Sequence, residues 1–387
     1  MAKRLIYMDH GATTPVREEV LDAMLPFLKE YFGNPSSLHR AGREVRRAVD
    51  EAREKTAVAL GAEPGEIYFT SGGTESNNIA LRGAAKMRPG GGHIITSSIE
   101  HHAVLDVCRD LEKDGFRVTY LPVDRFGCVD PDEVKAALAE DTFIISIMAA
   151  NNEIGTLQPV REIGSLAREH NVLFHTDAVQ VIGQLPFDVS ENNVDFLSLS
   201  AHKFNGPKGI GALYKRKGVK IDPLYHGGGQ ECKLRPGTEN VPGIVGLARA
   251  LELSVSEIPE KKKSLKALRD RLIEGFLSIE DVILNGHPEQ RLPGNVNVSF
   301  KYIEGESVLL SLDLEGIAAS SGSACSSGSL EPSHVLSAVG LDHATAHGSV
   351  RFSLGRGNSD ADIDYVLEKM PVIVERLRSM SPTYHSR

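Results

Sequence analysis

The stretch Asp195-Phe-Leu-Ser-Leu-Ser200-Ala-His-Lys203, which runs on into Phe204-Asn-Gly-Pro-Lys-Gly-Ile-Gly211, decides the fold class of this 387-residue chain. Its apolar beginning predicts a short buried strand, and a lysine follows at the strand's end beside a glycine-rich turn. A partly desolvated amine in that position can form an imine with a carbonyl group. Lys203 is the better candidate, because Lys208 lies within the turn and is expected to face solvent. A lysine considered alone is usually a surface residue, so the interpretation depends on its neighbours.

Short β-rich runs of the same kind recur on both sides of this stretch. With it they predict seven strands, at residues 66–70, 93–98, 117–123, 142–148, 172–176, 195–200 and 211–215. Long amphipathic stretches separate most of them, which is typical of an α/β fold with a mainly parallel sheet covered by helices on both faces. In such sheets the ligand sites lie at the carboxyl ends of the strands.

The pattern changes after about residue 258, where a smaller α+β unit is predicted. Its first helix places Leu265, Leu268, Leu272 and Phe276 on one face. The other elements expected there are a strand at 295–300, a helix at 307–314, a loop at 320–333, a strand at 349–354 and a helix at 360–378. We therefore expect a large domain over residues 15–258 and a small domain formed by residues 1–14 and 259–387.

Composition and charge exclude several classes of function. Lys and Arg number 43 against 52 Asp and Glu, a net charge of −9 that disfavours binding to nucleic acid or to an anionic membrane. No run approaches the 18 apolar residues of a membrane span, and an acid at position 9 interrupts any secretory signal, so a cytoplasmic protein is expected. The four cysteines are too scattered for a disulfide framework or a C-x-x-C metal site.

Two segments complete a possible cofactor site around Lys203. Asp177 ends an apolar run 26 residues earlier, where a carboxylate could keep a pyridine nitrogen protonated; capping a helix is the alternative. The turn Ser71-Gly-Gly-Thr74 lies between a strand and a helix, so the amides of Gly73 and Thr74 suit a phosphoester, although an ordinary capped turn would look similar. It matches neither a P-loop nor a dinucleotide fingerprint.

Three further residues have side chains that can take part in chemistry. His101 follows a strand, where its imidazole could stack on a flat ring and move protons; adjacent His102 points elsewhere on a helix, which disfavours zinc. Cys325 lies in the small-residue run 320–330, where an exposed thiol could accept a group or be incidental. Arg356 stands between two glycines after a strand and could hold a carboxylate.

Taken together, these motifs resemble pyridoxal-phosphate enzymes of fold type I, and within them the cysteine desulfurases of the NifS/IscS family, which are class-V aminotransferases. The resemblance covers nearly the whole chain. It is carried by Asp9-His-Gly-Ala-Thr-Thr-Pro15, Asn151-Asn-Glu-Ile-Gly155, His175-Thr-Asp-Ala-Val-Gln180, Ser200-Ala-His-Lys203 and Ser321-Gly-Ser-Ala-Cys325.

The resemblance implies a role for each site residue. Lys203 would hold pyridoxal 5'-phosphate as a Schiff base, His101 would stack on its ring and assist proton transfer, and Asp177 would pair with the pyridinium. The remaining implied contacts are Gln180 to the phenolic oxygen, Gly73, Thr74, Ser200 and His202 to the phosphate, Thr238 to the phosphate from a second subunit of a homodimer, and Asn152 and Arg356 to the substrate's carboxylate, with Asn152 also against the cofactor.

The implied activity is a sulfurtransferase reaction that converts L-cysteine to L-alanine and leaves a persulfide on Cys325. An iron-sulfur scaffold protein would accept this sulfur for iron-sulfur cluster assembly, and in some members the cysteine also helps to ligate a shared [2Fe-2S] cluster. Two alternatives stay open. One is a selenocysteine lyase, or another fold-type I lyase or aminotransferase, in which Cys325 is incidental. The other is a non-enzymatic sulfur or cluster carrier.

Overall fold

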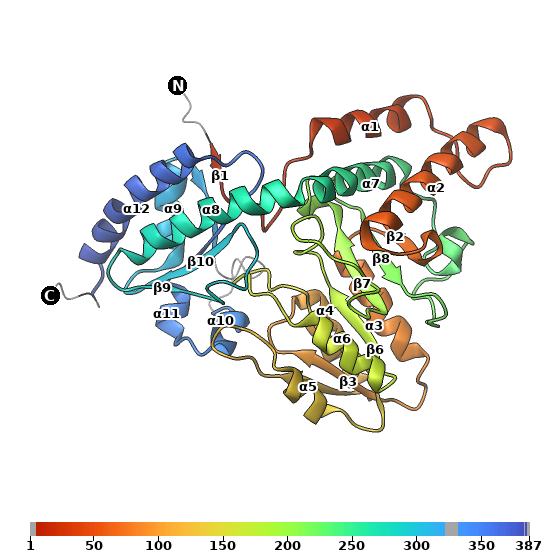
Figure 1. Ribbon diagram of the computed structural model, residues 1–387, viewed down its shortest axis with the longest axis horizontal. Helices are drawn as coiled ribbons and strands as arrows, with labels where there is room; N and C mark the ends of the chain where they lie inside the picture. Colours follow the sequence, from red (N-terminus) through yellow and green to blue (C-terminus); the bar gives the residue numbers. More distant parts are fainter. Residues whose placement is uncertain (1–4, 322–331, 383, 385–387) are drawn as a thin grey trace.

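The computed structural model describes residues 5–321, 332–382 and 384. Figure 1 shows two parts joined by the long helix α8 (Ile258–Leu277) and by the segment that follows strand β1 (Ile6–Tyr7). The larger part contains a wide twisted sheet with helices on both sides. The smaller part contains a second sheet, together with β1 near the start of the chain and helix α12 (Asp360–Ser379) near its end.

The large sheet has seven strands in the order β2-β8-β7-β6-β5-β3-β4. Their bounds are β2 Ile67–Thr70, β3 His93–Ser97, β4 Arg117–Leu121, β5 Thr142–Ser146, β6 Leu173–Asp177, β7 Phe196–Ser200 and β8 Gly211–Lys215. Strand β8 runs antiparallel to both of its neighbours, β2 and β7, and the other adjacent pairs of this sheet are parallel. The expected strands are therefore all present, with ends within two residues of the prediction, and the mainly parallel sheet is confirmed.

Apolar residues on both faces of the sheet explain this arrangement. Strands β3, β5 and β7 are buried along their whole length, which requires covering layers on both sides. One layer is formed by α3 (Gly73–Lys86) and α4 (His102–Lys113). The opposite layer is formed by α2 (Arg40–Leu60), α5 (Pro131–Ala137), α6 (Val160–Glu169) and α7 (Val241–Ser256), with α1 (Glu18–Lys29) packed against α7.

The smaller part is built on an antiparallel sheet in the order β12-β13-β10-β9, beside a parallel pair of β1 and β11. The bounds are β9 Val282–Leu284, β10 Asn295–Phe300, β11 Ile317–Ala318, β12 Ser320–Ser321, β13 Ser349–Ser353, α9 Gly305–Leu314, α10 His334–Ala338 and α11 His343–His347. The predicted apolar face of α8 is confirmed, because Leu265, Leu268, Leu272 and Phe276 are all buried in this core. The exact division of the chain into domains stays a prediction.

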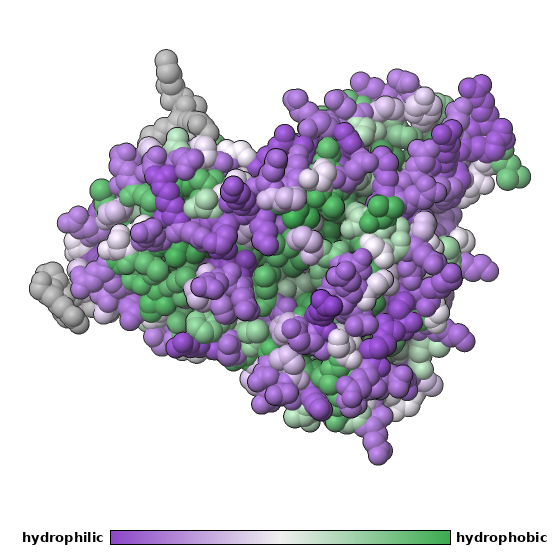
Figure 2. All heavy atoms as spheres, in the orientation of Figure 1, coloured by the Kyte–Doolittle hydropathy of each residue, from purple (hydrophilic) through white to green (hydrophobic). Residues whose placement is uncertain are grey.

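The surface is largely hydrophilic on the face that Figure 2 shows. Hydrophobic side chains gather toward the middle of this face and over the smaller sheet. Over the described ranges, none of the helices has the length and apolar character needed to cross a membrane. Cys108, Cys128 and Cys232 are free thiols, as their scattered spacing indicates.

Candidate active site

A cavity of about 320 Å³ lies at the carboxyl ends of β6 and β7. Its lining residues are Gly11, Ala12, Gly73, Thr74, Asn77, His101, Ala103, Met148, Ala150, Asn152, Asp177, Val179, Gln180, Ser200, His202, Lys203 and Arg351. Nine of them are site residues expected from the sequence. The structure therefore brings these nine together at the predicted edge of the sheet, while the role of each stays a prediction.

The amine of Lys203 is held at the wall of this cavity. The residue ends the short 3-10 helix η2 (Ala201–Lys203), which follows β7 directly. Its Nζ donates hydrogen bonds to the backbone carbonyls of Gly11 at 2.5 Å and Ala12 at 2.8 Å. Lys203 is half-buried and Lys208 is exposed, which is the difference expected between the two lysines.

Asp177 is fixed as the last residue of β6 and is only 7% exposed. One carboxylate oxygen accepts from Asn77 Nδ2 at 2.7 Å, and the other accepts from the backbone N–H of Val179 at 3.0 Å. The residues after Asp177 form turns rather than a helix, so its side chain does not cap one. Asn77 is fully buried in α3 and was not anticipated, because a polar residue inside a helix carries no local sign of what it contacts.

The N-terminus of α3 forms an end wall of the cavity. Its N-cap residue, Gly72, has no side chain that could cap the helix. A Cβ atom built on Gly73 would lie 2.6 Å from Val179 Cγ2 and 4.0 Å from Ser200 Cβ, which shows how tightly these residues approach. Partly unpaired amides and the positive end of the helix dipole make this an anion-binding wall.

Two histidines in the cavity are uncharged near neutral pH. Burial, together with the nearby charges of Lys203 and Lys208, lowers the pKa of His202 to about 4. Burial also lowers the pKa of His101, whose Nδ1 accepts from the backbone N–H of Ala103 at 3.0 Å. Because Nδ1 is an acceptor, the proton of the neutral ring is on Nε2. His101 therefore presents a flat, uncharged ring to the cavity.

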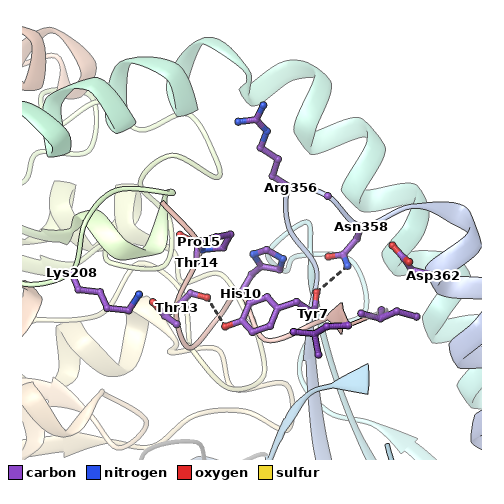
Figure 3. Close-up of a pocket in the computed structure, with 12 residues that line it drawn as sticks. Tyr7, His10, Thr13, Thr14, Pro15, Lys208, Arg356, Asn358 and Asp362 are labelled. Atoms are coloured by element: carbon purple, nitrogen blue, oxygen red, sulfur yellow. Dashed lines mark hydrogen bonds between the residues drawn. The ribbon is translucent and has the colours of Figure 1, made fainter. Parts of the chain in front are cut away.

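The two candidate arginines lie in different places. Arg356 lines a separate pocket with Tyr7 and His10, and Figure 3 shows its side chain pointing away from both. It is 50% exposed and lies 3.8 Å from a carboxylate oxygen of Glu19. The structure thus does not bring Arg356 to the cavity of Lys203.

Arg351, in β13, is the arginine that lines this cavity. Its side chain is 1% exposed, bonds the carboxylate of Asp9 at 2.9 Å and donates to the carbonyl of Asn152 at 2.9 Å. Its buried Nε has no hydrogen-bond partner in the part of the chain that the structure describes. A buried guanidinium with an unpaired donor at a cavity wall suits an anionic ligand group. The sequence analysis missed it because it lies inside a strand.

Of three other expected site residues, one lines another pocket, one lies outside the described residues and one lines the cavity. Thr238 lines a different pocket, together with Ser71 and Glu239. Cys325 lies outside the described residues. Gln180 does line the cavity, where its Nε2 donates to the carbonyl of Gly11 at 3.1 Å.

Glu100 is a buried acid directly before His101. One of its oxygens accepts from Ser97 Oγ at 2.7 Å and from the backbone N–H of Met148 at 2.8 Å. The other has no partner among the residues described. Burial raises the pKa of Glu100 to about 8, and the nearby charge of Asp177 adds to this effect. The acid is therefore mostly protonated at pH 7.

Glu100→Gln is expected to flatten the dependence of stability on pH. The folded protein holds a proton on Glu100 that the unfolded chain releases above pH 4.5, so this residue lowers stability as pH rises from about 4.5 to 8. The difference is at most about 1.4 kcal/mol per pH unit. Melting temperatures of both proteins from pH 5.5 to 8.5 measure it. Parallel curves would show that the Glu100 pKa is not raised.

The residues of the cavity fit pyridoxal 5'-phosphate. The open end of α3 suits the phosphate, the carboxylate of Asp177 suits a protonated ring nitrogen, and the amine of Lys203 suits an aldehyde. The buried, unpaired donor of Arg351 leaves a place for a second anionic group beside it. These groups lie within one cavity, so the donor set matches a phosphorylated pyridine aldehyde together with a small carboxylate substrate.

Comparisons with known proteins show the family of the chain. The aminotransferase class-V family model matches residues 6–366. Cysteine desulfurase IscS of Methanosarcina thermophila is 62% identical over 380 residues, covering 98% of this chain and 94% of that protein. A solved NifS-like protein has a TM-score of 0.91 at 44% identity, covering 96% of this chain and 100% of that one. SspA in complex with cysteine has a TM-score of 0.81 at 41% identity, covering 91% and 99%. The chain belongs to the aminotransferase class-V family, in its cysteine desulfurase branch.

Proposed function

We propose that this cysteine desulfurase converts L-cysteine to L-alanine and keeps the substrate's sulfur as a persulfide on Cys325. The observation that carries the proposal is the placement of Lys203, Asp177 and the N-terminus of α3 around one cavity. The named relatives and the related SspA, solved with cysteine, support cysteine as the substrate. Pyridoxal phosphate, when bound, supplies an electron sink that weakens the bonds at the substrate's Cα.

The residues of the chain would hold and orient the reactants. Gly73, Thr74, Ser200 and His202 would bind the phosphate, Gln180 the phenolic oxygen, and Asp177 the ring nitrogen. Nζ of Lys203 would first carry the cofactor and then move the proton of the substrate's Cα, because it is the basic amine of this cavity. The neutral ring of His101 would stack on the cofactor, with Nε2–H as its proton donor.

The sulfur transfer balances without an external oxidant. The Cys325 thiolate attacks the sulfur of the substrate, a new S–S bond forms and the Cβ–S bond breaks. The electron pair of the broken bond stays on the carbon, which takes up a proton and becomes the methyl group of alanine. A reductant or an acceptor thiol then removes the outer sulfur from Cys325.

The activity is tested by supplying L-cysteine and a reductant to the holoenzyme. Alanine and sulfide are expected to form in equal amounts, and comparing rates on cysteine and selenocysteine separates this reaction from that of a selenocysteine lyase. Absence of turnover in protein loaded with pyridoxal phosphate would overturn the proposal and favour a non-enzymatic carrier.

Arg351→Lys is expected to raise the KM for cysteine about tenfold or more, because a charge-assisted hydrogen bond to the substrate's carboxylate is lost. Arg356→Lys is the matched control, and it should change KM by less than about twofold, since Arg356 lies in another pocket. Asn152 would help to bind the same carboxylate. The reverse result, with KM raised only in Arg356→Lys, would assign the carboxylate to Arg356.

We further propose a homodimer in which Thr238 of one subunit reaches the phosphate site of the other. The support is that Thr238 does not line the cavity of its own chain. It lines a neighbouring pocket together with Ser71, which lies two residues before Gly73 in the sequence. Light scattering measures the dimer, and weaker cofactor binding in Thr238→Ala would show the shared contact.

The sulfur on Cys325 is proposed to pass to an iron-sulfur scaffold protein for cluster assembly, with Cys325 as a transient ligand of a shared [2Fe-2S] cluster. The support is the relationship to proteins named IscS. Transfer of labelled sulfur to a purified scaffold tests the first step, and the visible spectrum of the complex tests the second. The cytoplasmic location expected from the sequence belongs to the same proposal, and cell fractionation tests it.

A further inference from the structure

The turn at residues 151–155, which follows β5, is held firmly by the smaller sheet. Asn152 of this turn lines the cavity, and its carbonyl accepts a hydrogen bond from Arg351 at 2.9 Å. Two asparagine side chains of β10 donate to the carbonyl of Glu153, each at 3.1 Å. The position of the turn relative to both parts of the molecule is therefore fixed by side chains rather than by the turn alone.

The side chain of Glu153 connects this turn to the beginning of α10. Glu153 is 4% exposed, and its Oε2 accepts from Ser333 Oγ at 2.5 Å. Ser333 is the N-cap of α10 and also accepts from the backbone N–H groups of Val335 and Leu336. The next residue, His334, donates from Nε2 to the carbonyl of Glu100 at 2.9 Å. Ser333 and His334 are thus tied to the residues next to Asn152 and His101.

The chain is tied to the same turn on the other side of Cys325. Strand β12 ends at Ser321, four residues before Cys325 in the sequence. Its residue Ser320 pairs with Arg351, the residue that bonds the carbonyl of Asn152. The described residues on both sides of Cys325 are therefore connected to this turn: Ser320 reaches Asn152 through Arg351, and Ser333 bonds Glu153 directly.

We propose that Glu153 is a positioning residue for sulfur transfer: its bond to Ser333 fixes the chain eight residues after Cys325 relative to the substrate site. This inference rests on the proposed function, because it assumes that Cys325 attacks the sulfur of the substrate. Anchoring a chain near a site raises the effective concentration there of the reactive groups that the chain carries.

The burial of Glu153 supports its role as a positioning residue. Burial raises the pKa of Glu153 to about 7, while the bond from Ser333 and the charge of Arg351 act to lower it. A buried carboxylate is costly, and neutral groups could have joined two loops with less desolvation. Hydrogen bonds to a carboxylate are stronger and shorter than neutral ones, which suits an anchor that must hold a fixed geometry.

The test separates chemistry in the cavity from sulfur transfer in the holoenzyme. Stopped-flow absorbance of the bound cofactor after mixing with cysteine reports the first, and quenched labelling of persulfide on Cys325 reports the second. Persulfide formation is expected to slow about fivefold in Glu153→Gln and about tenfold in Ser333→Ala. The absorbance change should keep its rate within about twofold, and Ser333→Thr, which retains the hydroxyl, should restore most of the persulfide rate.

Glu306→Gln is the matched control, because it makes the same chemical change at an exposed residue of α9. It should leave both rates unchanged. The double variant Glu153→Gln/Ser333→Ala should be no slower than Ser333→Ala, since both substitutions act on the same hydrogen bond. If Glu153→Gln and Ser333→Ala slow both measured steps equally, or leave persulfide formation unchanged, Glu153 has only a structural role. An absorbance change in the wild type without any persulfide on Cys325 would instead overturn the proposed function.

Discussion

Cys325→Ser is expected to keep the yellow colour of the bound cofactor and to lower sulfide release by on the order of a thousandfold or more. A serine hydroxyl stays protonated at neutral pH and is a poor nucleophile toward sulfur, whereas a thiol ionises readily. Cofactor binding should be unaffected, because Cys325 is not among the residues proposed to hold pyridoxal phosphate. The absorption spectrum and parallel assays of alanine and sulfide measure the two effects.

The fate of the substrate in this variant is informative. Because Nζ of Lys203 is unchanged, exchange of the Cα proton of cysteine with solvent deuterium should continue, and mass spectrometry can follow it. Sustained release of sulfide by Cys325→Ser would contradict the role of Cys325 and favour a lyase that expels the sulfur directly.

Lys203→Ala is expected to lower turnover by on the order of 10⁴-fold, since the amine would both carry the cofactor and move the Cα proton. Pyridoxal phosphate should still bind without a covalent bond, because the end of α3 and the carboxylate of Asp177 are unchanged. Borohydride treatment followed by mass spectrometry measures this: the cofactor should be fixed to residue 203 in the wild type and released from the variant.

Lys208→Ala is the control for this experiment, because the exposed Lys208 lies five residues further along the same segment. It should keep wild-type turnover within about twofold. Two results would contradict the assignment of Lys203 as the residue that holds the cofactor: cofactor fixed by borohydride at Lys208, or turnover near the wild-type level in Lys203→Ala.

Much of the fold can be predicted from the sequence because its strands are short, apolar and separated by helices. Strand β7, for example, is an uninterrupted buried run whose end is marked by the polar residues that follow it. The strand ends differ from prediction mostly at their carboxyl termini, as in β4 and β5, where apolar residues continue past the last ladder hydrogen bond. Hydrogen bonding, rather than hydrophobicity, decides those last positions.

The site residues that the sequence identified share a local signal. Asp177 is the last residue of β6, Lys203 ends the short helix η2 that follows β7, and Gly73 and Thr74 open a helix after a turn of small residues. Such positions face the carboxyl edge of the sheet regardless of the details of packing. Local sequence therefore suffices to place them near one another.

The missed residues depend on tertiary structure instead. Asn77 lies within a helix and Arg351 within a strand, so their neighbours are set by how distant elements pack. Arg351 pairs across the smaller sheet with Asn297 on one side and Ser320 on the other, and that register directs its side chain to the cavity. Arg356, beside two glycines, has the stronger local signal but lies in a different pocket.

The walls of the cavity are spread along almost the entire polypeptide. Gly11 and Ala12 accept the hydrogen bonds of the lysine near one end of the sequence, and Arg351 closes the opposite side after about nine-tenths of the chain. During synthesis, the strands of the large sheet emerge well before β13, so they can assemble first. A cavity that has both its cofactor-binding residues and its complete substrate-binding wall is therefore expected to form late, after β13 has been synthesised. A chain truncated before β13 would lack this wall.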